Sequence, residues 1–369
     1  MIWGIIGLIS VFQGIVFFGH WIIYKGLINL LHLEGSAHLT AIKWTLFFFS
    51  ITFSVATILS QKFIGPIINW IYTAAAVWLG TLFWLTIVII VGLILSALLP
   101  AFGDSRFFGI VIFSTGLLIS AYGVWNSFNT QITSYTVALP NLPVVWENKK
   151  IVLVADTHFG NIRGKGSAEK FARLISAQKP EMVLIPGDFY DGPPADFETP
   201  AKIIGQIHAP KGIYFSSGNH EEFHQDNSAY LEALKAGGIK ILNNQAVEVD
   251  GLQILGVPFK NSNNVDSLIK LLAAIPFNKN KPSILIKHAP LALSGAAKSG
   301  INLEVSGHTH KGQMWPMSLI TKWMFKGYDY GMKNFESMVQ ITTSGAGTWG
   351  PPQRVGSKAE IVVINLVKK

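Results

Sequence analysis

The chain has 369 residues, of which half are hydrophobic and only 14% are charged, whereas an ordinary soluble domain has about a quarter charged residues. The charge is uneven, because residues 1–129 contain four Lys/Arg and two Asp/Glu, and residues 130–369 contain 25 and 19. This division excludes a wholly soluble protein, a wholly membranous one, and a disordered chain. The absence of cysteine excludes disulfides, thiolate metal ligands and cysteine nucleophiles. The net charge of +8 comes from scattered lysines and arginines and by itself selects no partner.

The first third of the sequence predicts a membrane anchor. Crossing the apolar core of a bilayer takes about 20 residues of helix. The start Met-Ile-Trp-Gly-Ile lacks the basic region of a cleavable signal peptide. We therefore expect a transmembrane region over residues 1–128 with four retained helices, centred on four uncharged runs at 1–24, 44–61, 70–99 and 107–128.

The loop charges favour one orientation of these helices. Four spans leave both ends of the region on one side of the membrane. The two loops on the opposite side carry Lys25, Lys43 and Arg106, and positively charged loops tend to stay in the cytoplasm. The pattern therefore favours an extracytoplasmic C-terminal region.

The remaining sequence alternates between strand and helix patterns. Residues 129–150 read as a linker with one strand at 134–139, and short β-rich runs then alternate with amphipathic stretches at 167–178, 229–236, 265–274 and 290–298. Such alternation predicts a layered α/β domain over residues 151–369. The expected strands are 151–155, 182–186, 212–216, 253–257, 283–287, 303–306, 338–342 and 361–366.

Five of these strands end in polar clusters, and ligands in α/β folds bind at the carboxyl ends of strands. Burying so many carboxylates and imidazoles together without a cation would be costly. The clusters are Asp156-Thr-His158, Gly187-Asp188-Phe-Tyr-Asp191, Gly218-Asn219-His220-Glu221, His288, and Gly307-His308-Thr-His310.

Together these blocks resemble the signature of the calcineurin-like metallophosphoesterase superfamily. The segment after His310 and the later Gly-Thr-Trp-Gly-Pro-Pro-Gln-Arg354 resemble its membrane-anchored bacterial branch, which includes relatives that hydrolyse UDP-2,3-diacylglucosamine in lipid A synthesis. The resemblance covers residues 151–366 and implies a sandwich of two mixed β-sheets flanked by helices, in a multi-pass protein of the bacterial inner membrane. Lys311 is a departure, because the branch usually has Gly there.

The resemblance implies two divalent metal ions. Their donors are imidazole, carboxylate and amide groups without sulfur, which suits Mn, Fe or Zn, and we expect Mn. The expected ligands of one ion are Asp156, His158 and His310, those of the other are Asn219, His288 and His308, and Asp188 would bridge the two.

The same pattern implies a mechanism. Hydroxide activated by the two metals would attack phosphorus in line, and His220 would protonate the leaving oxygen. Asp191 would orient a ligand histidine, and Glu221 would have a similar role.

Substrate contacts are less specific in the sequence. Arg163 and Lys165 could bind a phosphate or head group or form a plain basic turn, and Arg354 could clamp a substrate phosphate or cap its loop. Lys311 adds a cation beside the metals. Residues 315–325 could form an interfacial helix that admits acyl chains, with Trp315 and Trp323 as lipid contacts, or an ordinary helix packed on the sheet.

The leading hypothesis is therefore a membrane-anchored phosphohydrolase of phosphodiester or pyrophosphate bonds, acting on a lipid-linked substrate. A nuclease or nucleotide phosphodiesterase is an alternative, although no basic run or interleaved aromatic patch favours nucleic acid. A second alternative is a non-catalytic membrane sensor or scaffold, but none of the expected ligands is missing. No obligate protein partner is evident.

Overall fold

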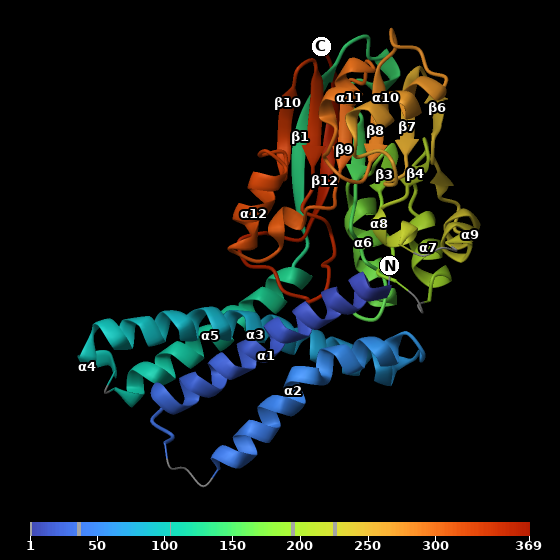
Figure 1. The fold of residues 1–369 in the computed structure, drawn as a ribbon. Coiled ribbons are helices and arrows are strands. Elements are labelled where there is room, and N and C mark those ends of the chain that lie inside the picture. Colours follow the sequence, from blue (N-terminus) through green and yellow to red (C-terminus); the bar gives the residue numbers. More distant parts are fainter. Residues whose placement is uncertain (1, 35–37, 104, 193–195, 224–226) are drawn as a thin grey trace. The chain divides into compact units, whose positions relative to one another are not determined.

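The computed structural model describes the chain except for residues 1, 35–37, 104, 193–195 and 224–226. It contains two compact units (Figure 1). The first comprises Met1–Trp125 and Gly350–Gln353, and the second comprises Asn126–Trp349 and Arg354–Lys369.

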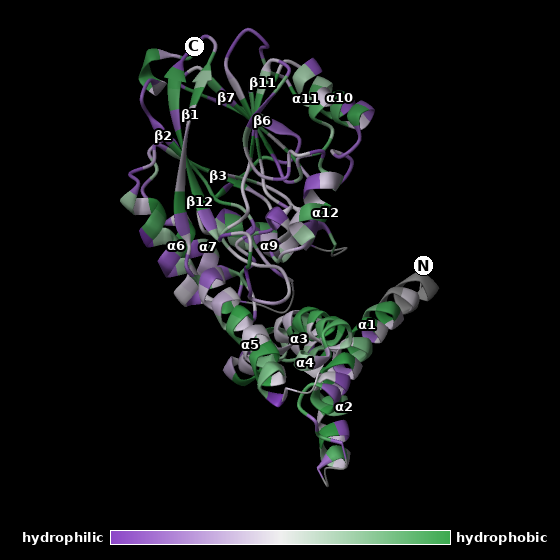
Figure 2. Ribbon diagram, turned by 90° about the vertical axis from the view of Figure 1, so that its left-hand side faces the viewer, coloured by the Kyte–Doolittle hydropathy of each residue, from purple (hydrophilic) through white to green (hydrophobic). Residues whose placement is uncertain are grey.

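The first unit is helical. Four of its helices are long and apolar enough to cross a membrane, and Figure 2 shows the hydrophobic residues along them. Within these helices the charged residues are Lys25, Lys43 and Arg106. Many large apolar side chains are exposed, as expected of surfaces that face lipid. The helices are α1 (Ile2–Asn29), α2 (Leu39–Ser60), α3 (Pro66–Leu98), the short α4 (Pro100–Gly103) and α5 (Arg106–Phe128).

Small residues bring these helices close together. A Cβ atom on Gly26 of α1 would lie 2.7 Å from the Ile89 side chain of α3, and one on Gly109 of α5 would lie 2.0 Å from the Leu30 carbonyl oxygen. Close approach of backbones at small residues is the usual way in which membrane helices gain packing energy.

The segment Gly350–Gln353 is part of this helical unit. The Gln353 side chain is buried, and its amide donates hydrogen bonds to the Val77 carbonyl oxygen of α3 (3.2 Å) and to Ser120 Oγ of α5 (2.9 Å). The segment therefore stays with the helices although it is more than 220 residues beyond them in sequence.

The second unit contains two six-stranded mixed sheets, as predicted. The first sheet has the order β1 (Gln131–Leu139), β12 (Glu360–Lys368), β2 (Lys150–Leu153), β3 (Met182–Pro186), β4 (Ile213–Ser216), β5 (Lys240–Ile241). The second has the order β10 (Gly331–Phe335), β11 (Met338–Thr342), β9 (Leu303–Ser306), β8 (Ser283–Lys287), β7 (Leu252–Val257), β6 (Gln245–Val249).

The sheets pack face to face over one apolar core. Leu153 and Leu184 of the first sheet and Ile286 and Val305 of the second are fully buried in it. Helices α6 (Lys165–Ala177), α7 (Glu198–Gly205) and α9 (Ser228–Ala236) cover the outer face of the first sheet, and α10 (Val265–Ala274) and α11 (Leu293–Lys298) cover that of the second. The central strands are thus buried on both faces, which explains their continuous apolar runs.

The segment 129–150, expected as a linker, is built into this unit. Strand β1 begins at Gln131 rather than Ser134 and pairs in parallel with β12 from Gln131↔Glu360 to Leu139↔Lys368. The following turn includes η1 (Val144–Trp146), where the Trp146 ring is buried in the core between the sheets. Only the pairing with the C-terminal strand reveals that this segment belongs to the sheet.

Candidate metal centre

The polar clusters meet because their strands are parallel. Strands β2, β3 and β4 are parallel neighbours in the first sheet, as are β8 and β9 in the second. The loops at their carboxyl ends therefore lie at one edge of the sandwich. They bring together the seven expected ligands and His220, with Asn219 to Glu222 forming the short helix α8 and His310 opening the turn η2 (His310–Gly312).

Asp156, His158 and His310 form the first ligand group. The Nε2 atoms of His158 and His310 are 3.1 Å apart, and Asp156 Oδ1 lies 4.0 Å from His310 Nε2. All three side chains are buried. Two ring nitrogens turned toward each other and toward a carboxylate are the arrangement that a shared cation would require.

Asp188, His288 and His308 form the second group. His288 Nε2 lies 3.1 Å from His308 Nδ1, 3.1 Å from Asp188 Oδ2 and 2.9 Å from Asn219 Oδ1. The same Oδ2 atom of Asp188 lies 4.0 Å from His158 Nε2 in the first group. One carboxylate oxygen thus faces both groups, as the predicted bridging role requires.

Hydrogen bonds orient two of the ligand rings. His158 Nδ1 lies 3.1 Å from Asp191 Oδ1, and His288 Nδ1 lies 2.7 Å from the Pro186 carbonyl oxygen. When these Nδ1 atoms carry the proton and donate it to oxygen, each Nε2 atom keeps a free lone pair. Both rings then offer the nitrogen that faces the centre, so the donor set fits divalent cations.

The pKa values of the expected ligands are shifted in both directions. Burial lowers the pKa of His308 to about 3, and burial together with the nearby His158 and Arg354 lowers the pKa of His310. Burial opposes ionisation of Asp188, but the neighbouring histidines, His288 first, lower its pKa overall. Burial also opposes protonation of His288 and His158, but the neighbouring carboxylates raise the pKa of His288 to about 9 and raise that of His158. Metal binding needs neutral imidazoles and ionised carboxylates, so a bound cation would have to displace the proton of His288.

The backbone at the ligands adopts an uncommon conformation. Asp156, His158, Asp188, His308 and His310 all have positive φ, between 47° and 71°. Such angles are infrequent outside glycine and recur at functional sites, where the surrounding structure holds them in place. The conformational preferences of these residue types do not favour such angles, so the tertiary structure determines where these side chains point.

Glu221 supports the loops rather than a histidine ring. Its fully buried carboxylate accepts hydrogen bonds from the backbone N–H groups of Asp188 (3.0 Å), Phe189 (2.8 Å), Tyr190 (3.2 Å) and Gly218 (2.9 Å). It therefore joins the loop after β3 to the loop after β4. The expectation was a role like that of Asp191, which faces a ligand ring, whereas the contacts of Glu221 are to the backbone of Asp188 and its neighbours.

His220 lies at the border of the centre. Its backbone N–H donates to Asp188 Oδ1 (2.9 Å), and its Nδ1 lies 2.8 Å from the Asp191 carbonyl oxygen. The ring packs edge-on to His158 with centroids 4.7 Å apart. The side chain is 12% exposed, so it can reach a bound substrate while its Nδ1 stays anchored.

Two expected substrate-binding arginines are instead buried in the fold. Arg163 is 2% exposed, donates to the Ser127 carbonyl oxygen (2.8 Å) and stacks on the Phe128 ring. Arg354 is fully buried and contacts His310 and the carbonyl oxygens of Ser344 and Gly347. Of the two alternatives that the sequence left open for each arginine, these contacts favour the structural one, because burial leaves neither guanidinium free for a substrate.

The other expected contacts remain accessible. Lys165 is exposed and lies 3.8 Å from Glu169 one helical turn away. The Lys311 ammonium lies over the Tyr330 ring, 4.5 Å from its centroid, and Lys311 has a φ of 51°. Glycine is favoured at such an angle, which is consistent with the glycine that the resemblance implies at this position. Trp315 and Trp323 are 50% and 79% exposed.

Three further residues lie around the centre, and of these only Phe325 was given a role from the sequence, as part of the possible interfacial helix. Phe259 lies against His308 and His288, with centroids 5.4 and 5.8 Å apart, and Phe325 lies 6.1 Å from His308. The Gln313 amide exchanges two hydrogen bonds with the backbone of Trp349. Gln313 belongs to the motif that contains His308 and His310, although no role was predicted for it, whereas nothing in the sequence marks Phe259.

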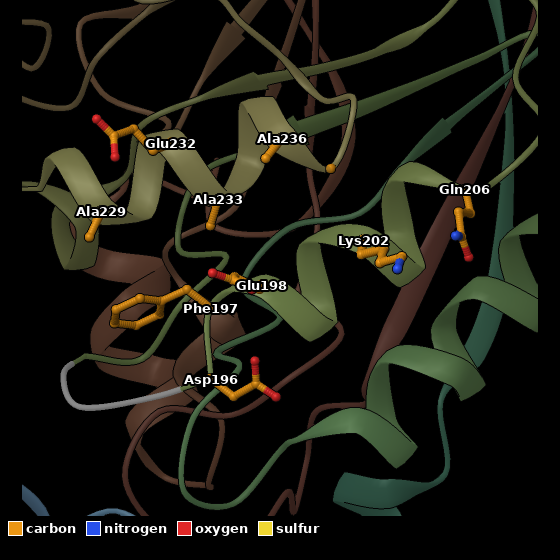
Figure 3. A pocket seen from close by; sticks show the side chains of 10 residues that line it. Asp196, Phe197, Glu198, Lys202, Gln206, Ala229, Glu232, Ala233 and Ala236 are labelled. Carbon is orange, nitrogen blue, oxygen red and sulfur yellow. The ribbon is translucent and has the colours of Figure 1, made fainter.

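A separate hollow lies between α7 and α9 in the same unit (Figure 3). Its volume is about 840 Å³, and its lining includes Phe197, Glu198, Lys202 and Glu232. None of the expected metal ligands lines it. Among the described residues, its lining contains both acidic and basic side chains but no group of them suited to binding a metal ion. We therefore assign the catalytic chemistry to the metal centre.

Comparisons with known proteins agree with this geometry. Residues 149–312 match the model of the calcineurin-like phosphoesterase family. An uncharacterized metallophosphoesterase of Campylobacter jejuni is 30% identical over 268 residues, which cover 70% of this chain and 71% of the relative. A Bos taurus transmembrane protein with a metallophosphoesterase domain is 29% identical over 269 residues, or 68% of this chain and 60% of that protein.

The comparisons and the site therefore define a phosphoester hydrolase whose centre contains groups of side chains suited to metal ions. The chain belongs to the calcineurin-like metallophosphoesterase family, as its motifs predicted. The four apolar helices and the transmembrane relatives together indicate a membrane protein.

Proposed function

We propose that this protein hydrolyses a phosphodiester or pyrophosphate bond in a lipid-linked substrate, using two divalent cations. The observation that carries the proposal is the position of Asp188, whose Oδ2 atom faces His288 Nε2 at 3.1 Å and His158 Nε2 at 4.0 Å. A carboxylate between two ligand groups suits a pair of cations that clamps one phosphoryl group.

When bound, the two cations activate water and neutralise charge that develops on the phosphoryl oxygens. Asp156, His158, His310 and Asp188 would hold one, and Asp188, Asn219, His288 and His308 the other. The nitrogen and oxygen donors without sulfur make Mn the first cation to test, with Fe and Zn next.

His220 would supply the proton for the leaving oxygen. Nδ1 of His220 donates a hydrogen bond to the Asp191 carbonyl oxygen, so the proton on Nδ1 stays on the ring. The proton on Nε2 of the imidazolium is then the one available to the leaving group. Afterwards the neutral ring retains its Nδ1 proton and its anchor.

The membrane helices support a substrate that resides in the bilayer. The proposed location is the bacterial inner membrane, with the metal centre on the extracytoplasmic side. The support is that Lys25, Lys43 and Arg106, expected in loops, lie in the helix ends that flank the two opposite loops. A UDP-2,3-diacylglucosamine-like substrate would instead favour a cytoplasmic centre.

The test is an activity screen on purified, Mn²⁺-loaded full-length protein. It compares a soluble diester, bis-p-nitrophenyl phosphate, with UDP-diacylglucosamine and with phospholipids in mixed micelles. We expect hydrolysis of the soluble diester and faster turnover of a lipid-linked phosphate. Activity on neither class, with both cations bound, would contradict the proposal.

A further inference from the structure

Helix α12 (Met317–Met324) has an unusual surface. None of its eight residues is buried. Leu319 is 60% exposed and Trp323 is 79% exposed, and Ile320 and Met324 are also exposed. By contrast, α10 in the same domain buries Leu268 and Leu272 against its sheet. A helix that turns its apolar side chains outward presents a binding surface.

The position of α12 depends on its two ends. Before it, a Cβ atom on Gly312 would lie 2.3 Å from the Ser318 nitrogen, so the turn after His310 touches the start of the helix. After it, Phe325 is buried beside the His308 ring. The outward apolar side chains are therefore not needed to hold α12 against the metal centre.

Two short chain connections tie this domain to the helical unit. Only two residues separate the end of α5 at Phe128 from the start of β1 at Gln131. The backbone of Trp349 is hydrogen-bonded to the Gln313 side chain. The next residues in the chain, Gly350–Gln353, belong to the helical unit. Trp349 is itself 62% exposed.

The composition of the surface fits a bilayer. Leu319 and Trp323 are four residues apart and share one side of the helix. Tryptophan is enriched at membrane interfaces, and the exposed Lys322 and Lys326 can interact with anionic head groups.

We propose that α12 lies in the interfacial layer of a phospholipid bilayer, with Leu319 and Trp323 among the acyl chains. The proposed contact between α12 and the bilayer does not depend on which substrate the protein hydrolyses. A second role rests on the proposed function: lipid-linked substrates would reach the metals along α12, which adjoins two expected ligands, His308 and His310.

The absence of cysteine from the natural chain allows a direct test. Single variants Leu319→Cys and Trp323→Cys, labelled with a nitroxide, are placed as full-length protein in nanodiscs of phosphatidylcholine and phosphatidylglycerol. Ala273→Cys, at an exposed position of α10, is the matched control. Power-saturation spectroscopy then compares label accessibility to oxygen with accessibility to a water-soluble nickel complex.

We expect the labels on α12 to favour oxygen and the label on α10 to favour nickel. Equal nickel accessibility at all three positions would overturn the proposal. Both α12 sites are exposed, so either one suffices if the other variant does not fold, as judged by circular dichroism.

The entrance role has a separate measurement. In Trp323→Ser, the ratio of turnover on a vesicle-borne lipid substrate to turnover on a soluble diester should fall several-fold. If the labels face lipid but the turnover ratio is unchanged, α12 contacts the membrane but is not the entrance for the substrate. If no substrate is hydrolysed at all, the labels still report on the membrane contact while the proposed function fails.

Discussion

Arg354 holds His310 from the far end of the domain. Its Nη1 atom donates to the His310 carbonyl oxygen (3.3 Å), and its Nη2 atom lies 3.3 Å from the His310 ring nitrogen Nδ1. The same guanidinium donates to the carbonyl oxygens of Ser344 and Gly347. One fully buried side chain thus fixes both the backbone and the ring of an expected metal ligand.

Substitution Arg354→Lys should weaken binding of the cation held by Asp156, His158 and His310. A lysine ammonium cannot reproduce the planar set of donors, and loss of a group that orients a ligand typically lowers metal affinity about 10–100-fold. Titration of the metal-free protein with Mn²⁺ measures this. Arg173→Lys on the exposed face of α6 is the control, and an unchanged affinity would leave Arg354 with a role in stability only.

We expect different outcomes for two substitutions at the metal centre. Asp188→Asn should reduce the content to fewer than two ions per chain, because the bridging charge is lost. His220→Ala should keep both ions but lower turnover about 10²–10⁴-fold, the usual contribution of a general acid. Elemental analysis and kinetics on the same preparations separate the two.

The exposed His208→Ala is the control for both variants. Full turnover by the His220 variant would remove the proton donor from the mechanism. Fewer than two ions in the unaltered protein purified with Mn²⁺ would count against the whole site.

Glu221→Gln should destabilise the catalytic domain. Each carboxylate oxygen of Glu221 accepts two backbone N–H groups. The amide –NH₂ of glutamine would face two of these donors and leave them unpaired, at a cost of about 3 kcal/mol. Thermal unfolding in detergent measures the loss, with the exposed Glu232→Gln as control. Equal melting temperatures would contradict the structural role.

Gly80→Ala should destabilise the helical unit. A Cβ atom there would lie 2.6 Å from Gln353 Cδ, which displaces the amide from Val77 and Ser120. Loss of these buried hydrogen bonds is expected to cost about 1–2 kcal/mol. Gly14→Ala is the matched control, because no atom lies within 4 Å of its Cβ position. Similar melting temperatures for the two variants would show that the Gln353 contact is dispensable.

The orientation in the membrane is tested by fusions at the C-terminus. If the helix ends with Lys25, Lys43 and Arg106 and the loops beside them are cytoplasmic, an alkaline phosphatase fusion should be active and a green fluorescent protein fusion dark. Positively charged loops resist translocation, which is the physical reason. The reverse pattern would place the metal centre in the cytoplasm and favour a UDP-diacylglucosamine-like substrate.

Much of this protein was predictable from local sequence. Long uncharged runs are sufficient to identify apolar helices, and the amphipathic pattern of α10 predicted the same boundaries, Val265 and Ala274, that the structure shows. The family was also predictable, because Asp156-Thr-His158 and Gly307-His308-Thr-His310 retain their spacing within single loops. Such signals need no knowledge of distant neighbours.

The tertiary structure decided which polar residues are accessible. In the sequence, Arg163 and Arg354 are possible phosphate ligands. In the structure, Arg163 stacks on Phe128, which lies 35 residues away in the sequence, and Arg354 contacts His310, which lies 44 residues away. Strand β1 joined the sheet only through its pairing with β12. The apolar residues of α12 fitted either a core helix or a membrane surface, and their exposure distinguishes the two. Burial depends on packing between segments far apart in the chain, so composition and spacing could not determine it.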